Sequence, residues 1–172
     1  MILTALSESA PRADPFRQAQ EGPPLTGRKT KRDFTISGQA TPEAVRDMLA
    51  ALRAHMQAVG AGGSLCGTVE LCVAEALNNI VEHAYAGQAP GLVWLTARSS
   101  DGGMTIELRD KGRPLPGLSV PRRQLPDASG GLDALPEGGF GWFLIHDLTR
   151  ALSYARRAGQ NLLTLEFGNN PG

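Results

Sequence analysis

The spacing of apolar residues changes from a helical period to alternation near Gly87. Before this point, residues 42–59 and 64–85 repeat apolar side chains every three or four positions, as amphipathic helices do. After it, residues 91–100 and 103–110 alternate apolar and polar side chains, as half-buried strands do. A chain whose helices and strands fall in separate blocks favours an α+β fold over regularly alternating β/α units.

Turn residues complete the predicted order of elements. Asp101-Gly102-Gly103 joins two strands as a hairpin, and residues 158–161 turn a second, closing hairpin. An earlier strand covers residues 32–38, and a glycine-rich entry leads into a last helix near residue 140. The order strand, helix, helix, strand, strand, long loop, helix, strand, strand predicts a two-layer sandwich, with helices on one face of a mainly antiparallel sheet.

Capping residues set the expected helix ends. Thr41 is the expected N-cap of the first helix, because Pro42 suits the first helical position. Ser64 is the expected cap of the second, longer helix, which runs to about Tyr85. We assign residues 31–168 to one domain and predict flexible tails at residues 1–30, which are rich in proline, and 169–172.

Composition narrows the class of protein. With 172 residues and 41% hydrophobic side chains, the chain has enough material for one domain with a core. Lys plus Arg equals Asp plus Glu at 17 each, so no overall charge favours nucleic acid or a membrane surface. The basic run at residues 28–32 is interpreted as a solvated segment. No signal peptide and no apolar run of membrane-spanning length is recognised, so we expect a cytoplasmic protein.

The two cysteines are predicted to be reduced. On one helix, Cys66 and Cys72 would lie about 120° apart and could not form a disulfide. Neither has the close cysteine or histidine neighbour of a metal site.

The second helix carries an unusual polar side. Its apolar face is predicted to bury Val69, Val73, Ala76, Leu77, Ile80 and Ala84. The opposite side carries Glu75, Asn79, Glu82 and His83. Glu75 and Asn79 lie one turn apart, so both side chains can converge on one object, although on the helix alone an ordinary solvated face is the favoured explanation.

Two later segments carry residues suited to ligand binding. Asp110 ends a strand, and Gly112 follows two residues later. The Asp110 carboxylate can accept a hydrogen bond from an exocyclic amine, and Gly112 lets a flat ring approach the backbone. Glycines in the second segment precede the last helix, where free N–H groups suit a phosphate chain: Gly138, Gly139 and Gly141. Taken alone, the Asp-x-Gly segment is a common turn, and the glycines before the last helix are a flexible hinge. The loop at residues 111–138, with five prolines, is long enough to be a lid.

Together these segments resemble the GHKL-type ATPases, which share the Bergerat nucleotide-binding fold. The shared pattern is Glu-x-x-x-Asn on a helix, then Asp-x-Gly after a strand, then a lid that ends in Gly-x-Gly before a helix. Within that superfamily the chain is similar to the bacterial anti-sigma-factor serine/threonine kinases, in "EALNNIVEHAY" and "GGFGWFLIHDLTRALSYARRAGQNLLTLEF". The resemblance covers roughly residues 32–167.

The resemblance implies a role for each matching residue. Asn79 is the expected Mg²⁺ ligand, since the metal takes oxygen ligands and keeps several waters. Glu75 is the expected general base, and Asp110 the expected acceptor of the adenine 6-amino group, with Gly112 admitting the ring. Gly139 and Gly141 are expected to line the phosphates, and Gly138 to close over them with the lid.

Other residues of these motifs receive no chemical role. Tyr85 is interpreted as a packing residue, and His83 as a hydrogen-bonded structural residue. Asn78 is placed at the border of the apolar face, with a structural hydrogen bond. The lid has no evident phosphate-binding lysine, and three arginines remain candidates for that role: Arg113, Arg122 and Arg123.

The function implied by the resemblance is an ATP- and Mg²⁺-dependent serine/threonine kinase. Its expected partners are a STAS-domain anti-sigma-factor antagonist, which it would phosphorylate, and a sigma factor; a homodimer remains open. A P-loop and the protein-kinase signatures His-Arg-Asp and Asp-Phe-Gly are absent from the sequence. The alternative is a non-catalytic nucleotide-binding module that sequesters a regulator. An ATP-driven chaperone or topoisomerase would need a transducer domain.

Overall fold

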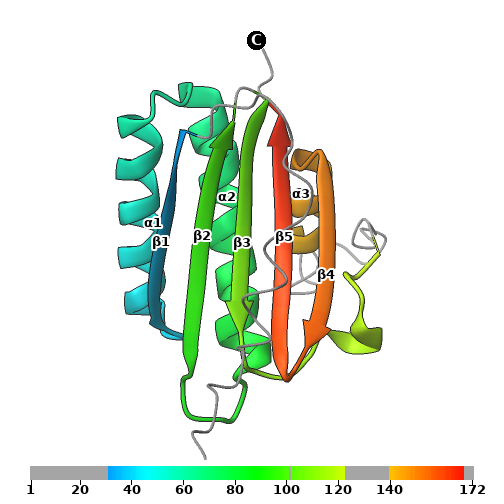
Figure 1. Cartoon of the computed structure of the whole chain (residues 1–172). Helices are drawn as coiled ribbons and strands as arrows, with labels where there is room; N and C mark the ends of the chain where they lie inside the picture. Colours follow the sequence, from blue (N-terminus) through cyan, green and yellow to red (C-terminus); the bar gives the residue numbers. More distant parts are fainter. Residues whose placement is uncertain (1–30, 101, 123–139, 169–172) are drawn as a thin grey trace, which may run out of the picture.

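A computed structural model describes residues 31–100, 102–122 and 140–168 (Figure 1). Five antiparallel strands form one sheet in the order β1-β2-β3-β5-β4. The strands are β1 (Lys31–Gln39), β2 (Leu92–Ser100), β3 (Gly103–Asp110), β4 (Ala151–Arg157) and β5 (Gln160–Gly168). The tails predicted at residues 1–30 and 169–172 lie outside the described residues.

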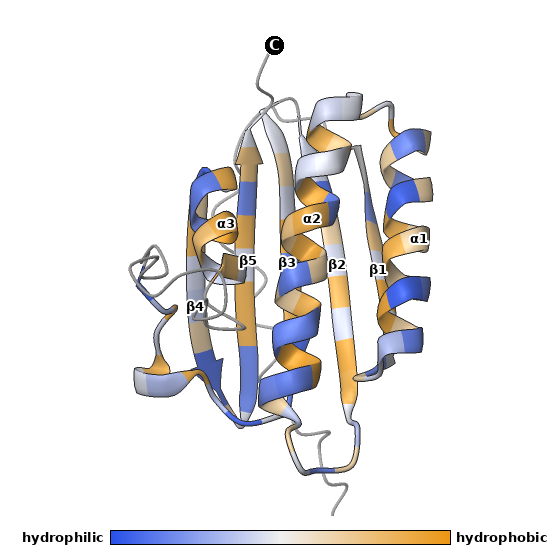
Figure 2. Cartoon of the chain, turned by 180° about the vertical axis from the view of Figure 1, so that it is seen from behind, coloured by the Kyte–Doolittle hydropathy of each residue, from blue (hydrophilic) through white to orange (hydrophobic). Residues whose placement is uncertain are grey.

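The helices cover one face of this sheet. They are α1 (Pro42–Ala58), α2 (Gly63–Asn79), its π-helical continuation η2 (Ile80–Ala84) and α3 (Phe140–Leu148); a short 3-10 helix, η3, spans Pro116–Leu118. Seen from behind, α1, α2 and α3 lie in one layer over the sheet (Figure 2). The predicted α+β two-layer sandwich and its order of elements are therefore confirmed.

The two long helices begin in different ways. Thr41 caps α1 as predicted, because its hydroxyl oxygen accepts the backbone N–H of Ala44 at 3.3 Å. The predicted Ser64 cap of α2 is wrong. The N-cap is Gly62, whose carbonyl accepts the Cys66 N–H at 2.9 Å, and no side chain caps this end. Glycine is a tolerated N-cap, so Ser64 already lies within the helix.

The end of α2 departs from a regular helix. From Ile80 to Ala84 the backbone is π-helical, and Tyr85 N donates to Ile80 O at 3.2 Å, five residues back. A π turn holds more residues than an α turn, so it changes the direction in which the following side chains point. The sequence predicted an unbroken α-helix here, since propensities do not distinguish the two.

The closing hairpin is tighter than predicted. Ala158 and Gly159 alone form the turn, with φ of +47° and +77°. Two successive positive φ values are the geometry of a type I′ turn, which matches the twist of antiparallel strands. Gln160 and Asn161, assigned to the turn from the sequence, are instead the first residues of β5. Asn161 thereby lies opposite Asp110 of β3.

The core lies between the helices and the sheet. Its fully buried large side chains come from every layer: Met48, Leu52, Met56, Val69, Val73, Leu77, Leu95, Ile106, Leu108, Ile145, Leu165 and Phe167. Burying one such side chain contributes about 1.5–3 kcal/mol. Cys72 is buried and Cys66 partly buried, and both are free thiols, as predicted. Within the described ranges, no helix is both long and apolar enough to cross a membrane.

Candidate functional site

A cavity of about 410 Å³ opens between the helical layer and one end of the sheet. Its walls are mainly apolar, with a few polar groups. The lining comes from α2 and η2 (Ala76, Asn79, Ile80, His83, Ala84), from the end of β3 and its loop (Asp110, Arg113, Pro114, Leu115, Pro116, Pro121), and from Trp142, Tyr154, Asn161 and Leu163. A mainly apolar hollow with few polar groups is typical of small-molecule sites.

Asp110 supplies the buried carboxylate of this cavity. It is the last residue of β3 and only 4% exposed. Its Oδ1 accepts the backbone N–H of Gly112 at 2.7 Å and the side-chain N–H of Asn161 at 2.8 Å. Within the described residues no donor is found for Oδ2, so this oxygen remains available to a ligand in the cavity.

Burial raises the pKa of Asp110 above its ordinary value. The hydrogen bonds from Asn161 and Gly112, and the positive charge of Arg156, act in the opposite direction without cancelling the effect of burial. Ionised, this carboxyl group only accepts hydrogen bonds, so its Oδ2 suits an amine donor.

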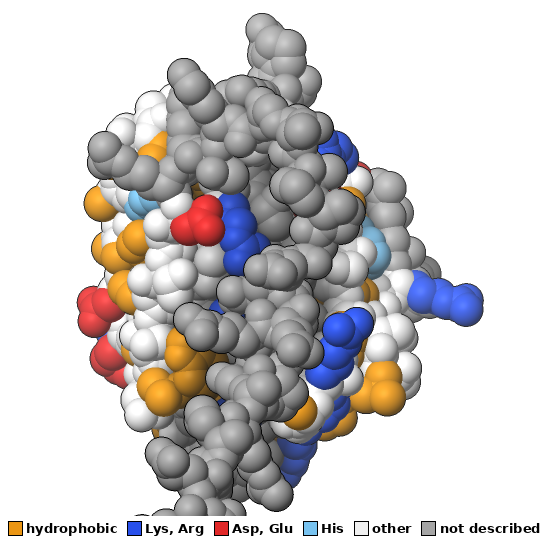
Figure 3. Space-filling view, in the orientation of Figure 1, with side chains coloured by type: hydrophobic (Ala, Val, Ile, Leu, Met, Phe, Trp, Pro, Cys, Tyr) orange, Lys and Arg blue, Asp and Glu red, His pale blue; other side chains and the backbone are white. Residues whose placement is uncertain are grey.

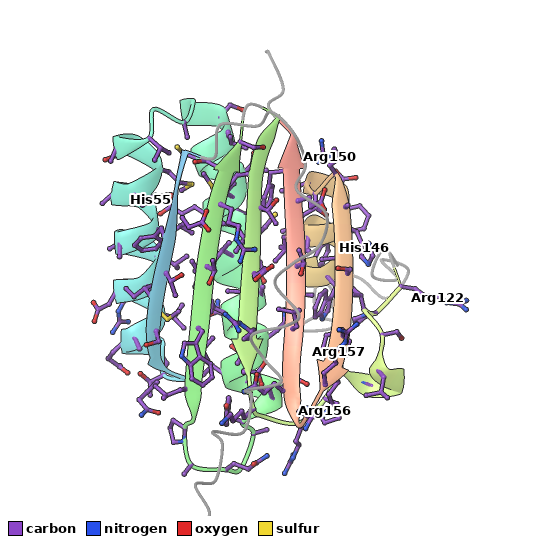
Figure 4. All side chains as sticks on the ribbon, viewed as in Figure 1. His55, Arg122, His146, Arg150, Arg156 and Arg157 are labelled. Atoms are coloured by element: carbon purple, nitrogen blue, oxygen red, sulfur yellow. The ribbon has the colours of Figure 1, made fainter. Side chains whose placement is uncertain are left out.

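Asn161 is a site residue that the sequence did not reveal. It is 5% exposed and faces Asp110 across the β3–β5 ladder and Arg156 across the β4–β5 ladder. Its Oδ1 accepts from the Tyr154 hydroxyl at 2.7 Å and from the Arg156 guanidinium. Figure 4 shows Arg156 at the end of β4 nearest the hairpin turn. The sequence could have revealed Asn161 through strand register, because a two-residue hairpin turn places Asn161 opposite Asp110.

Gly112 is explained by a close approach of two chain segments. A Cβ at this position would lie 2.6 Å from the carbonyl oxygen of Ala84 and 2.8 Å from its Cβ. Arg113 N donates to the same Ala84 carbonyl at 2.8 Å, so the loop after β3 is joined to the end of η2. Glycine is therefore needed to close the cavity, whether or not a flat ring also approaches it.

Gly112→Ala is expected to destabilise the fold by about 1–3 kcal/mol, because the new methyl group meets backbone atoms that cannot move aside. Urea unfolding measures this change in the free energy of unfolding. Gly67→Ala is the matched control: it lies exposed on α2 with no atom within 4 Å of the new Cβ. There we expect a gain of about 0.5–1 kcal/mol. Equal stability of both variants would contradict this account of Gly112.

Glu75, Asn79 and Gly141 come together elsewhere along α2. A Cβ at Gly141 would lie 2.6 Å from Glu75 Oε2 and 3.7 Å from Asn79 Nδ2. The first turn of α3 thus approaches both side chains, and a Cβ at this position would require the Glu75 carboxylate to move. Asn79 Nδ2 donates to the Glu75 carbonyl at 2.8 Å, so its Oδ1 points away from that bond. The predicted convergence of Glu75 and Asn79 with the glycine-rich entry is found at Gly141; Gly138 and Gly139 lie outside the described residues.

The donor set at this position fits Mg²⁺. The described residues contain no group of three or more His, Cys, Asp or Glu side chains that could hold a metal ion. Mg²⁺ is usually bound through one or two protein oxygens together with phosphate oxygens and water. The Oδ1 of Asn79, with the Glu75 carboxylate nearby, matches that minimal requirement.

The predictions for the other residues near the end of the helix had different outcomes. Tyr85 is buried, donates to Leu92 O and accepts from Lys111 N at 3.1 Å, so it is the structural residue expected. His83 and Asn78 are both exposed, and the structural hydrogen bonds predicted for them are not found within the described ranges. His83 lines the cavity together with Asn79, which lies about one turn earlier on the same side of the helix.

Basic side chains lie around the loop after β3. Arg113 lines the cavity, whereas Arg122 is exposed and points outward from the loop in Figure 4. Arg123 lies outside the described residues. Lys and Arg side chains also gather beside the lower part of β4 in the space-filling view (Figure 3), where Arg157 is exposed. Of the three arginines considered for phosphate, Arg113 is therefore the one placed at the cavity.

Comparison with known proteins places this site in a family. The family model described as "Histidine kinase-like ATPase domain" matches residues 38–167, which is most of the chain. The serine/threonine-protein kinase BtrW of Bordetella bronchiseptica is 39% identical over 107 residues, covering 60% of this chain and 71% of that protein.

Two solved structures share the fold. The RsbU and RsbW domains of Rv1364c from Mycobacterium tuberculosis give a TM-score of 0.57 at 22% identity, covering 83% of this chain and 34% of that longer one. The SiaB–SiaC complex of Pseudomonas aeruginosa gives 0.50 at 18% identity, covering 77% of this chain and 87% of the matched one. The chain therefore belongs to the histidine kinase-like ATPase family, with a serine/threonine kinase among its relatives, as its three motifs predicted.

Proposed function

We propose that this protein is an ATP- and Mg²⁺-dependent serine/threonine kinase that acts as an anti-sigma regulatory factor. The observation that carries the proposal is the unused Oδ2 of Asp110 in an apolar cavity that Asn79 also lines. A buried carboxylate with one free oxygen fits the 6-amino group of adenine. The apolar walls fit the faces of a purine ring.

The chain's own residues divide the work of binding and transfer. Asp110 accepts from the exocyclic amine, and Asn79 offers its Oδ1 to the cation. Mg²⁺-ATP supplies the phosphoryl group and the neutralising charge on which such transfer depends. Glu75 accepts the proton of the attacking serine or threonine hydroxyl. Gly141 keeps the start of α3 close to Glu75, so the carboxylate faces the entry to that helix.

The proposed partners follow from the relatives. BtrW is named a serine/threonine-protein kinase, and the two solved structures contain SiaB with SiaC and RsbW with RsbU domains. By extension, we propose that this chain phosphorylates a STAS-domain anti-sigma-factor antagonist and binds a sigma factor in the cytoplasm. Partner choice would follow the phosphorylation state of the antagonist.

The second candidate is a nucleotide-binding module that sequesters a regulator without phosphorylating it. The same cavity supports it, because nucleotide binding and phosphoryl transfer rest on different side chains. Glu75 separates the two functions, since it is assigned to proton transfer alone.

Asn79→Ala is expected to abolish the Mg²⁺-dependent part of the thermal stabilisation by ATP, because it removes the only metal ligand assigned to the chain. A ligand at about 100 times its Kd adds roughly 2.7 kcal/mol to folded-state stability, which is a clear shift in Tm. The measurement is thermal unfolding with ATP, with and without Mg²⁺. Asn78→Ala is the matched control, as Asn78 is exposed beside it and is expected to keep the full shift.

An unchanged Mg²⁺-dependent shift in Asn79→Ala would exclude this residue as the metal ligand. If the wild type shows no shift with any adenine nucleotide, the proposed function itself is wrong.

A further inference from the structure

The side-chain amide of Asn161 is held from two sides. Its Oδ1 accepts hydrogen bonds from the Tyr154 hydroxyl and the Arg156 guanidinium. Its Nδ2 donates to Asp110 Oδ1 at 2.8 Å and to the Arg113 carbonyl at 3.1 Å. Every hydrogen-bonding group of this buried amide is therefore used, at a position where an unmade bond would be costly.

Arg156 on one side and the Arg113 carbonyl on the other both fix which way the amide points. A guanidinium group carries only donors, so the atom facing it must be the amide oxygen. A hydroxyl such as that of Tyr154 both donates and accepts, so it would tolerate either orientation. With the oxygen of Asn161 directed to β4, its N–H groups are directed to Asp110.

The same groups fix the loop that follows Asp110. Arg156 Nη1 donates to the Gly112 carbonyl at 3.0 Å, and the Tyr154 hydroxyl accepts the Leu115 N–H at 3.2 Å. Together with the bond from Asn161 to the Arg113 carbonyl, these contacts tie successive loop backbone groups to β4 and β5. The loop that lines the cavity thus depends on the closing hairpin.

This arrangement has a chemical consequence for Asp110. Its Oδ1 already accepts two N–H bonds, so a proton on this carboxyl group would have to sit on Oδ2, the oxygen open to the cavity. Ionised Asp110 therefore presents an acceptor to the ligand, and protonated Asp110 presents a donor. Burial favours the protonated form, while Asn161, Gly112 and the charge of Arg156 favour the ionised one.

We propose that Asn161, oriented by Arg156, is a specificity-determining residue: it keeps Asp110 an acceptor toward the ligand and so selects a 6-amino purine over a 6-oxo purine. This inference rests on the proposed nucleotide-binding function. Asn161 acts through Asp110 and is therefore a positioning residue, which need not touch the base itself.

The effect of Asn161 on Asp110 must be distinguished from the effects of other titratable or charged groups around the cavity. Arg156 and Tyr154 face Asn161 from β4, Arg113 lines the cavity from the loop, and His83 lines it from η2. His83 is the histidine among these groups, so the experiment is repeated in a His83→Gln background.

The test compares ATP with inosine triphosphate, which replaces the 6-amino group with an oxygen. Calorimetry gives the Kd of each nucleotide as a function of pH, because burial raises the pKa of Asp110. The proteins are the wild type, Asn161→Leu, Arg156→Met and Tyr154→Phe. Circular dichroism checks that each is folded.

In Asn161→Leu, Asp110 loses one donor, so its carboxylate is destabilised and its pKa rises further. ATP needs the ionised form, so ATP affinity is lost as pH falls through the raised pKa, and inosine triphosphate affinity rises. For a shift of one pKa unit, the preference for ATP falls about tenfold at a pH between the two pKa values. We expect Arg156→Met to act in the same direction and Tyr154→Phe to lower both affinities by the same factor.

The outcomes are separable. A wild type that binds neither nucleotide overturns the proposed function and the inference with it. If the wild type binds ATP, but Asn161→Leu lowers the affinity for both nucleotides equally and leaves the pH dependence of binding unchanged, the inference alone is wrong. If Asn161→Leu does not fold, Arg156→Met decides by the same criterion, since Arg156 is only partly buried.

Discussion

Asp110→Asn is expected to weaken ATP binding strongly and to admit inosine triphosphate in its place. Gly112 N and Asn161 Nδ2 both donate to the same carboxylate oxygen, so the oxygen of the new amide must occupy that position. Its NH₂ group then faces the cavity, where a donor meets the donor of adenine. An unmatched buried polar pair costs about 1–3 kcal/mol, so the loss of ATP affinity is expected to approach 100-fold.

Calorimetry with both nucleotides measures this exchange of specificity. Asp47→Asn, on the exposed side of α1, is the matched control and is expected to bind ATP as the wild type does. Undiminished ATP binding by Asp110→Asn would remove Asp110 from the site. Loss of both nucleotides, with the fold intact, would mean that the amide does not take the orientation argued here.

Glu75→Gln is expected to lower phosphoryl transfer by about 10²–10⁴-fold while leaving nucleotide binding intact, because an amide cannot accept the hydroxyl proton. The isosteric change suits this position, because it keeps the side-chain shape that packs beside Gly141. Transfer is followed by mass spectrometry of a STAS-domain protein incubated with Mg²⁺-ATP, and binding by the ATP-dependent shift in Tm.

Glu82→Gln is the matched control, because Glu82 is exposed on η2 and has no assigned role. Unaltered transfer by Glu75→Gln would exclude Glu75 as the base. A wild type that retains its partner but never phosphorylates it would support the sequestering module instead.

Local signals predicted much of the fold. Thr41 and Pro42 mark the start of α1 because capping depends on neighbouring residues, and alternation marks the strands because each has one buried face. Glu75 and Asn79 were found because one helical turn separates them. The family resemblance joined these residues to Asp110 and Gly141, which spacing alone could not do.

What the sequence missed depends on contacts between distant segments. Asn161 was read as a turn residue, since Asn is common in turns, and its role exists only through its register with Asp110 and Arg156. The π-helical end of α2 was also missed, because a π turn has no clear sequence signature.

The order of strands has a consequence for how the domain is assembled during synthesis. β5 lies between β3 and β4, yet it follows every other described strand along the chain. Until Gln160–Gly168 leaves the ribosome, β3 is an open edge, β4 has no neighbour in the sheet, and Asp110 lacks Asn161. In a partly synthesised chain the candidate site is therefore unfinished, and it is completed in one late step when the last described strand is inserted.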